Sequence, residues 1–302
     1  RGSVFGITTR IEAVSAAADD LSRGNFGNTL VVTSRDEVGE LARSFNTMTR
    51  QLRQRLEMQK AIDLAGEIQQ NLLPQKSFEG KGLVVSGKSI YCDETGGDFY
   101  DILHYPGSDR KVGIAVGDVV GHGIGAALLM TTVRALLRCR ISRSGSLGEI
   151  IGDVNELLCR DTIVTGNFVT LFYMVVDVES GVASWVRGGH EPAIVYSPMT
   201  GTFSELKGKG VALGVDAGIK YEYNEISLPR EEQLILIGSD GAWEIENVGG
   251  EQFGKDRLKQ IVAASSDAHP EKILETIVNE IAIFRGTAPQ SDDITLAVIK
   301  TG

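Results

Sequence analysis

The chain has 302 residues, more than one compact domain usually needs, and its 42% of hydrophobic residues can bury a substantial core. Its formal net charge of −10 argues against a nucleic-acid-binding surface, which requires a basic stripe. The charge is unevenly distributed, because residues 1–56 hold 8 of the 30 Lys and Arg residues but only 6 of the 40 Asp and Glu residues. The excess of carboxylates therefore lies in the rest of the chain, where some of them can be ligands.

Cysteine usage and hydropathy indicate the redox compartment of the protein and whether the sequence contains a membrane-spanning segment. Cys92, Cys139 and Cys159 are widely spaced and form no CxxC pair. This usage is typical of a reducing compartment, and it disfavours both a disulfide framework and a thiolate zinc site. No uninterrupted apolar run is long enough to cross a bilayer. Because the chain begins at Arg1 rather than Met, we expect it to be a fragment of a longer protein.

The N-terminal part has helical periodicity. Over residues 7–21, apolar side chains recur at alternating steps of four and three, which predicts a helix with one packing seam. Two glycines in RGNFGNTL end this helix, and Ser34 to Glu37 has the S-x-x-E form of a capping box, which predicts a second helix up to Pro74. Because neither helix can bury its apolar stripe alone, we expect a parallel, coiled-coil-like bundle in a dimer.

Residues 4–55 resemble a HAMP domain, the helical relay that follows transmembrane helices in bacterial receptors. The matching residues are the first helix, GNF at 25–27 with Gly24 before it, and DEVGELARSFNTM at 36–48. The chain departs from the family pattern at ITTRI, because a proline common near the start of the first helix is absent. A plain coiled-coil dimeriser is the alternative interpretation of this segment.

The HAMP resemblance implies a domain organisation and a location. We expect a HAMP relay domain over residues 1–55 and a helical coiled-coil linker over residues 56–74, with a homodimer formed through these helices. A connection to the membrane would exist only through a transmembrane segment before Arg1. The chain would then be a cytoplasmic fragment of a bacterial inner-membrane protein that contains the sensor.

After Pro74 the periodicity changes to that of strands. Runs rich in β-formers lie between turn residues at 83–91, 111–118, 168–178, 182–187, 193–197, 232–240 and 294–300. Helical patterns lie at 124–142, 147–160, 254–265 and 270–285. The predicted strands outnumber the helices and come in hairpin-like pairs. This order predicts an α+β fold rather than strict βαβ alternation.

Four aspartates stand at the ends of predicted strands: Asp98, Asp118, Asp240 and Asp292. Three of them have glycine neighbours, and glycine lets backbone segments approach closely. Carboxylate and carbonyl oxygens suit Mg²⁺ or Mn²⁺, and four clustered carboxylates without a cation would be very unfavourable. A single Asp-Gly pair is usually only a turn, but four at matching strand ends predict a metal site. The four histidines show no ligand spacing, which disfavours zinc: His104, His122, His190 and His269.

The same residues resemble the metal-dependent serine/threonine protein phosphatases of the PPM superfamily, in their SpoIIE-type, RsbU-like branch. The resemblance covers about residues 60–300, with its motifs in family order: IQQNLLP (68–74), GGDFYD (96–101), GDVVGHGIGAAL (117–128), GNFVTLFY (166–173), GGHEPAIV (188–195), SDGAWE (239–244) and SDDITL (291–296). It implies a PPM-type αββα sandwich over residues 75–302, in which two central antiparallel sheets are flanked by helices.

The phosphatase resemblance also implies residue roles and a substrate. Asp118 would bridge two Mn²⁺ or Mg²⁺ ions, and the carbonyl of Val119 would be a further ligand. Asp98 would hold the second ion, whereas Asp240 and Asp292 would hold the first. Two such ions can activate a shared water for in-line attack on phosphorus, without a covalent nucleophile. The family's usual substrate is a phosphorylated STAS-domain anti-sigma-factor antagonist, whose dephosphorylation would start a partner switch that controls transcription.

Two family features lack clear counterparts here. Eukaryotic members carry Asp-Gly-His with the histidine as a proposed general acid, whereas His122 follows Asp118 by four residues. We do not transfer that role, because His122 could equally cap the next helix. The phosphate-binding arginine has only a weak candidate, Arg187. Asp101 and Asp293 could support the ligands or could be surface carboxylates.

The leading hypothesis is therefore a metal-dependent phosphoserine/phosphothreonine phosphatase regulated through a HAMP relay. A second hypothesis is a non-catalytic docking module that keeps the fold and has lost the chemistry. Loss of any ligand aspartate would favour it, yet all four are present. A third hypothesis is a structural relay whose C-terminal domain only dimerises, which leaves the glycine-flanked aspartates unexplained.

Overall fold

The computed structural model describes residues 2–80, 82–105, 108 and 110–302, with side chains described from residue 7 onward. The chain forms two compact units, Arg1–Leu64 and Ala65–Gly302. Within the described part of the chain, no helix combines the length and the apolar character needed to cross a membrane.

The first unit is helical, as its periodicity predicts. Helix α1 is Gly2–Ser22, and helix α2 is Glu37–Leu72, of which the last turns belong to the second unit. Among the described side chains of the first unit, only a few apolar ones are buried: Ala17, Ala42 and Phe45. Most of the predicted seam remains exposed in a single chain: Ile7, Ile11, Leu41, Met48, Leu52 and Leu56. An apolar stripe of this kind is typical of helices that pack against further helices.

The start of α2 differs from the predicted capping box. Asp36 caps the helix, because its carboxylate accepts a hydrogen bond from the backbone N–H of Gly39 at 3.0 Å. The Ser34 hydroxyl donates to the same carboxylate instead of capping the helix itself. That hydroxyl, followed by the Gly39 N–H, lowers the pKa of Asp36. The prediction of a box between Ser34 and Glu37 is therefore wrong, although the helix begins where it was expected.

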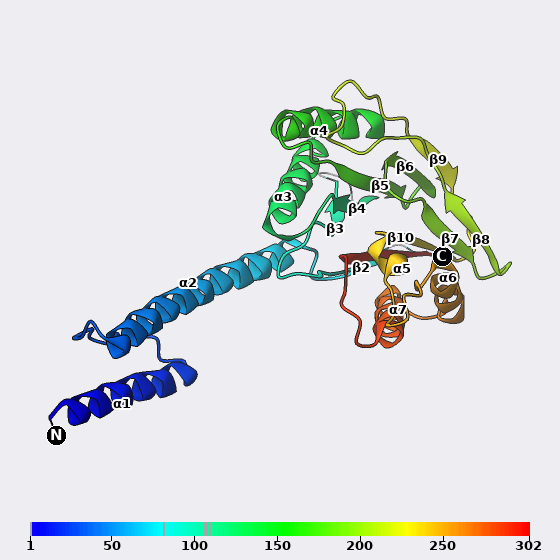
Figure 1. The fold of residues 1–302 in the computed structure, drawn as a ribbon. Coiled ribbons are helices and arrows are strands. Elements are labelled where there is room, and N and C mark those ends of the chain that lie inside the picture. The colour runs from blue at the N-terminus through cyan, green and yellow to red at the C-terminus, as the bar shows by residue number, and fades with distance from the viewer. Residues whose placement is uncertain (1, 81, 106–107, 109) are drawn as a thin grey trace. The chain divides into compact units, whose positions relative to one another are not determined.

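The second unit contains two antiparallel sheets that pack face to face (Figure 1). The six-stranded sheet has the order β1-β2-β11-β10-β7-β8, with β1 Phe78–Gly80, β2 Leu83–Ile90, β7 Ala193–Ser197, β8 Thr202–Leu206, β10 Gln233–Gly238 and β11 Ile294–Thr301. The five-stranded sheet has the order β3-β4-β5-β6-β9, with β3 Phe99–His104, β4 Lys111–Val119, β5 Val169–Asp177, β6 Val182–Gly188 and β9 Asn224–Ser227.

Helices cover the outer face of each sheet. On the five-stranded sheet lie α3 Gly123–Arg140 and α4 Leu147–Thr162, and on the six-stranded sheet lie α6 Lys255–Ala264 and α7 Pro270–Arg285 (Figure 1). A single short helix turn, α5 Gly241–Glu244, follows β10. The predicted αββα sandwich is confirmed.

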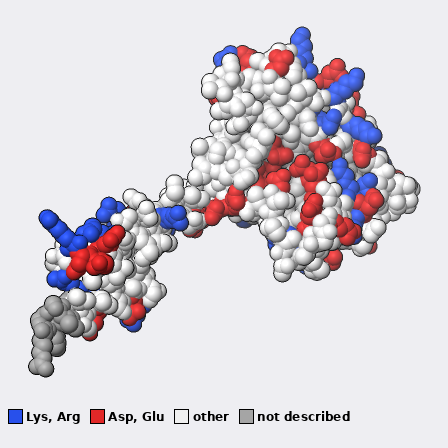
Figure 2. All heavy atoms as spheres, viewed as in Figure 1, with Lys and Arg blue, Asp and Glu red and all other residues white. Residues whose placement is uncertain are grey.

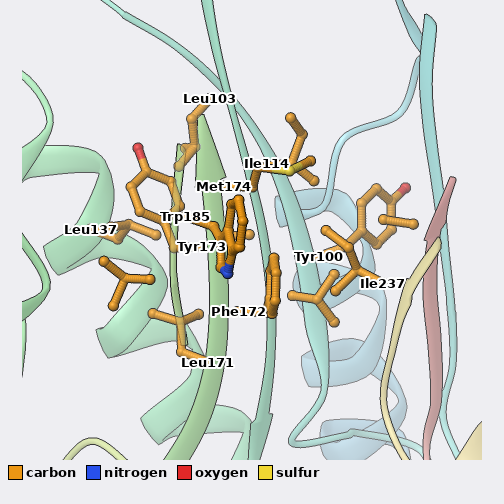
Figure 3. Packing of buried hydrophobic residues seen from close by; sticks show 14 of the residues in the cluster. Tyr100, Leu103, Ile114, Leu137, Leu171, Phe172, Tyr173, Met174, Trp185 and Ile237 are labelled. Carbon is orange, nitrogen blue, oxygen red and sulfur yellow. The ribbon is translucent and has the colours of Figure 1, made fainter. Parts of the chain in front are cut away.

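The core fills both the space between the sheets and the space under the helices. Successive residues of a strand point to opposite faces, so the adjacent, fully buried Phe172 and Tyr173 of β5 serve different layers. In Figure 3, Leu137 of α3 lies on one side of β5 and Ile237 of β10 lies on the other. Each large side chain buried in this way contributes about 1.5–3 kcal/mol to folding.

The sequence patterns missed short or fully buried elements. Each predicted range corresponds to a strand or helix of the structure, but β1, β8, β9 and α5 are short and gave no clear pattern. Strand β3 was missed for another reason. All of its residues except the terminal His104 are buried, so it lacks the alternation of apolar and polar residues that marks a half-exposed strand.

Candidate active site

Two of the predicted ligands lie at one end of the five-stranded sheet. Strands β3 and β4 are antiparallel, with Phe99 opposite Gly117, so the start of β3 lies beside the end of β4. Asp98 immediately precedes β3, and Asp118 is the last residue but one of β4. The strand pairing therefore brings these two aspartates together.

The other two predicted ligands come from the six-stranded sheet. Gly238 at the end of β10 lies opposite Leu296 of β11. Asp240 follows β10 by two residues, and Asp292 precedes β11 by two residues. The negative charges of Asp240 and Asp292 act on Asp118, which shows that the two pairs meet between the sheets.

Burial and mutual repulsion shift the protonation of this group. Burial raises the pKa of Asp98 well above its ordinary value, and the charge of Asp118 raises it further. Burial also raises the pKa of Asp118 to about 6, with the charges of Asp240 and Asp292 adding to it. Burial likewise raises the pKa of Asp292. A bound cation reverses these shifts, because it stabilises the charged carboxylates.

The residues present fit a hard divalent cation by their chemistry. Asp98 is 2% exposed, and its Oδ2 is buried without a hydrogen-bond partner. Across the described ranges, no three His, Cys, Asp or Glu side chains already converge on one point as ligands. The fit therefore rests on the oxygen donors and on this unpartnered atom, which a cation would satisfy.

Glycines allow the segments of the site to approach each other. A Cβ on Gly97 would lie 2.9 Å from the carbonyl oxygen of Val119, so this carbonyl faces the segment that carries Asp98. A Cβ on Gly241 would lie 2.0 Å from the carbonyl oxygen of Asp293, closer than any side chain allows. Close approach of the backbone therefore requires glycine at positions 97 and 241, as the sequence pattern predicted.

Asp293 supports the site through the backbone. Its Oδ1 accepts the N–H of Cys92 at 2.8 Å, and its Oδ2 accepts the N–H groups of Gly97 at 2.8 Å and Asp98 at 3.4 Å. The side chain is 3% exposed and holds the loop of residues 92–98 in place. The sequence left open whether Asp293 supports the ligands or is a surface carboxylate, and the structure favours support of the ligands.

Asp101 supports the fold farther from the ligands. It is fully buried in β3 and forms two hydrogen bonds of 2.6 Å with the Arg138 guanidinium. Arg134 Nε lies 3.1 Å from the same carboxylate. Asp101 thus ties β3 to α3.

Sequence reasoning gave no role to two hydroxyl groups beside Asp98. The Ser239 and Thr295 side chains favour the charged form of Asp98 and oppose the rise in its pKa, although burial outweighs them. The Ser239 hydroxyl donates to the Asp293 carbonyl at 3.4 Å, and the Thr295 hydroxyl donates to the Ser89 hydroxyl at 2.7 Å. The Ser239 hydroxyl also accepts the backbone N–H of Thr295 at 3.0 Å. The available signal was their position, since each lies within three residues of a predicted ligand at a strand end.

His122 does not cap α3 with its side chain, and the Arg187 guanidinium is engaged elsewhere. His122 occupies the N-cap position of α3, but its side chain makes no cap bond; instead its Nδ1 lies 2.6 Å from Oδ2 of Asp93. Arg187 donates from Nε to the Gly208 carbonyl and from Nη1 to the His190 carbonyl, each at 2.7 Å. The guanidinium therefore binds backbone oxygens.

A cleft of about 350 Å³ opens over the aspartates. Its lining includes Asp118, Asp240 and Asp292, with Val120 and Phe168 as apolar walls. Figure 2 shows acidic side chains gathered on this face of the second unit, between α3 and α5. A larger cavity of about 580 Å³ lies around the start of α4, but none of the four aspartates lines it. The carboxylates, rather than cavity size, identify the site.

The sandwich has the fold of the PP2C-type phosphatase domains. The SiaA-PP2C domain of Pseudomonas aeruginosa superimposes with a TM-score of 0.70 at 22% identity, over 82% of this chain and 98% of that one. The PP2C domain of SpoIIE from Bacillus subtilis, with a fragment of its regulatory domain, superimposes with a TM-score of 0.61 at 19% identity, over 74% of this chain and 63% of that one. At these identities the likeness shows the fold.

Residues 108–302 match the family model described as Stage II sporulation protein E, so the chain belongs to the SpoIIE family. Residues 6–54 match the HAMP domain model, which confirms that resemblance. Phosphoserine phosphatase RsbU of Bacillus subtilis is 24% identical over 244 residues, which cover 81% of this chain and 71% of RsbU. Protein IcfG of Synechocystis is 28% identical over an alignment of 334 positions, which covers 98% of this chain and 50% of IcfG.

Proposed function

We propose that this chain is a phosphatase that requires two divalent metal ions and removes phosphate from phosphoserine or phosphothreonine in a partner protein. One observation carries the proposal: Asp118, Asp240 and Asp292, from the ends of two sheets, line one cleft, and the buried Asp98 lies close enough to Asp118 for their charges to act on one another. A buried group of carboxylates with raised pKa values is typical of a functional site.

The position of Asp118 supports its role as the bridging ligand. The charges of Asp240 and Asp292 raise its pKa, and its own charge raises the pKa of Asp98. Asp118 therefore lies near the other three carboxylates. Asp98 and the Val119 carbonyl would complete the site from the five-stranded sheet. When bound, two Mn²⁺ or Mg²⁺ ions would lower the pKa of a water and offset the charge of the phosphoryl group.

The protein's own residues hold this arrangement and shape the access to it. Ser239 and Thr295 favour the charged form of Asp98, and Asp293 fixes the loop before it. Val120 and Phe168 give the cleft apolar walls beside the aspartates.

A protein substrate is supported by the composition of the cleft. Its lining residues include no Lys or Arg that could bind a phosphoamino acid by itself. Specificity must then come from surfaces outside the cleft that dock a folded partner. The relative RsbU is named a phosphoserine phosphatase, which supports the phosphoserine part of the proposal. We propose a phosphorylated STAS-domain anti-sigma-factor antagonist as the partner, on the family resemblance.

The HAMP match supports a regulated, dimeric arrangement. We propose a HAMP relay over residues 1–55, a coiled-coil linker over 56–74 and the phosphatase domain over 75–302, with the exposed seam of the first unit covered in a homodimer. The chain would act in the cytoplasm as the output part of a membrane-linked sensor.

The test is hydrolysis of a phosphorylated STAS-domain protein by the purified chain, with Mn²⁺ or Mg²⁺ added and then chelated. The proposal requires turnover that depends on the metal and is lost in Asp118→Asn. Binding of the partner without turnover at any metal concentration would favour the non-catalytic docking module.

A further inference from the structure

The side chain of Gln69 forms a two-way amide pair with the loop that leads to Asp98. Gln69 lies near the end of α2, in the part of the helix that belongs to the second unit, and is 3% exposed. Its Nε2 donates to the carbonyl of Gly96 at 2.6 Å, and its Oε1 accepts the N–H of the same residue at 3.1 Å. Both backbone groups of one buried peptide residue thus depend on one side chain.

The end of α2 is itself fixed against the phosphatase unit. A Cβ on Gly66 would lie 2.2 Å from the carbonyl oxygen of Glu94, so only glycine lets the helix lie directly against the loop. One turn beyond Gln69, Leu73 is 5% exposed within the main core. The Tyr100 hydroxyl donates to the carbonyl of Pro74 at 2.7 Å. These contacts set the rotation of α2 at which Gln69 faces Gly96.

The loop of residues 92–98 is held from its other side by Asp293, through the N–H groups of Cys92, Gly97 and Asp98. A Cβ on Gly96 would lie 2.1 Å from the ring of Tyr91, so only glycine fits at this position of the loop. Gln69 and Asp293 together satisfy the backbone of the segment that places Asp98.

We infer that Gln69 is a positioning residue for the metal site: it holds Gly96 so that the buried Asp98 carboxylate is in place before an ion binds. The inference rests on the proposed function, because it assigns Gln69 a part in forming the site proposed above. Glutamine suits the position because it is neutral and both donates and accepts. A residue lacking either group leaves a buried backbone atom without a partner, which favours displacement of the loop.

The test compares Gln69→Met with Gln70→Met in the full chain. Methionine keeps the length and packing of glutamine but cannot pair with a peptide group. Gln70 is the matched control, because it is the next residue of the same helix and its side chain is exposed. Two measurements are made on metal-free protein: Mn²⁺ affinity by titration calorimetry and amide hydrogen exchange over residues 92–98.

We expect Gln69→Met to bind Mn²⁺ at least tenfold more weakly and to exchange the loop amides at least tenfold faster, whereas Gln70→Met matches the parent. Hydrolysis by Gln69→Met should recover toward the parent value at high Mn²⁺, which a purely structural defect would not allow. If Gln69→Met does not fold, Gln69→Glu, which keeps the acceptor and loses the donor, should show the same direction of change.

Unchanged Mn²⁺ affinity and unchanged exchange in a folded Gln69 variant would overturn the inference. A parent that neither binds Mn²⁺ nor hydrolyses phosphoesters would overturn the proposed function instead, and with it the assignment of Gln69 to a metal site. If the parent binds Mn²⁺ and the Gln69 variant binds it equally well, the inference about Gln69 fails while the proposed function stands.

Discussion

Asp293 accepts the backbone N–H of Gly97 at 2.8 Å across 196 positions of the chain. The bond joins the segment before β11 of the six-stranded sheet to the segment before β3 of the five-stranded sheet. Because each segment carries a proposed metal ligand, Asp292 or Asp98, this one side chain fixes the two sheets in register at the site. The carboxylate is needed for its two acceptor oxygens, whose bonds also include Cys92.

Asp293→Asn should therefore damage both stability and the site. An amide has one acceptor oxygen, so its NH₂ group would face backbone N–H donors and leave at least one of them buried and unpaired. We expect a loss of about 1–3 kcal/mol in the free energy of unfolding, measured by urea denaturation. Asp267→Asn, at an exposed position, is the control and should change stability by no more than about 0.5 kcal/mol. Equal stability of the two variants would contradict the bridging role.

Asp118→Asn should have opposite effects on activity and on the stability of the metal-free protein. Turnover should fall below detection, because the variant loses the central charged ligand. Without metal, the variant should be more stable than the parent by on the order of 3 kcal/mol, since burial and neighbouring aspartates raise the pKa of Asp118 to about 6 from its ordinary value of 3.8. Thermal unfolding in chelator at pH 7.5 measures this difference.

Metal should reverse that order of stability. Saturating Mn²⁺ binds only the folded state, so it should raise the melting temperature of the parent and leave Asp118→Asn nearly unchanged. If neither the melting temperature nor the turnover of the parent changes with Mn²⁺ or chelator, the two-metal proposal is excluded.

His190 should make the protein sensitive to mild acid. It is 3% exposed, its Nδ1 lies 2.8 Å from the Thr170 hydroxyl, and burial lowers its pKa to about 4. Glu191 opposes this shift and Arg187 adds to it. Between pH 6.5 and about 4 the unfolded chain binds a proton that the folded chain does not, so stability is lost as the pH falls through this window.

The expected contribution of His190 is about 3 kcal/mol over that window. It is measured by comparing urea unfolding of the parent and of His190→Gln at pH 7 and at pH 4.5. The variant should be less stable than the parent at pH 7, where it lacks the packed imidazole, but should lose less stability on acidification. Parallel losses in both proteins would show that other groups cause the acid sensitivity.

The sequence predicts the site better than it predicts what supports it. Asp118 and Asp240 stand out because glycine and an apolar strand surround each of them, which is a local pattern. Gln69 and Asp293 bind backbone groups that lie 27 and 201 positions away, so no spacing within the chain marks them. Likewise, strand β3 was missed because tertiary burial on both faces removed its periodicity.

Substrate docking should be visible in kinetics. Because the cleft lining holds no Lys or Arg, a short phosphopeptide gains little binding energy there. We expect kcat/KM for a folded phosphoprotein partner to exceed that for its excised phosphopeptide by at least about 100-fold, which corresponds to about 3 kcal/mol of binding outside the cleft. Equal kcat/KM values on the two substrates would argue against docking by the partner's fold.

The register of α2 should control activity more than its length does. The helix runs unbroken over Glu37–Leu72, and the pairing of Gln69 with Gly96 fixes the rotation of its last turns. A continuous helix transmits rotation because its residues are locked at 3.6 per turn. Deleting the two residues 54–55 turns one end relative to the other by roughly 160°, whereas deleting the four residues 53–56 leaves a mismatch of only roughly 40°.

We therefore expect the two-residue deletion to change basal phosphatase activity much more than the four-residue deletion. Light scattering and circular dichroism serve as controls that both variants keep the oligomeric state and the helix content of the parent. A relay through α2 depends on which faces of the helix meet their partners, and the four-residue deletion nearly restores those faces. A tether depends only on reach, so equal activity of both deletions and the parent would reduce α2 to a tether and favour the plain coiled-coil dimeriser.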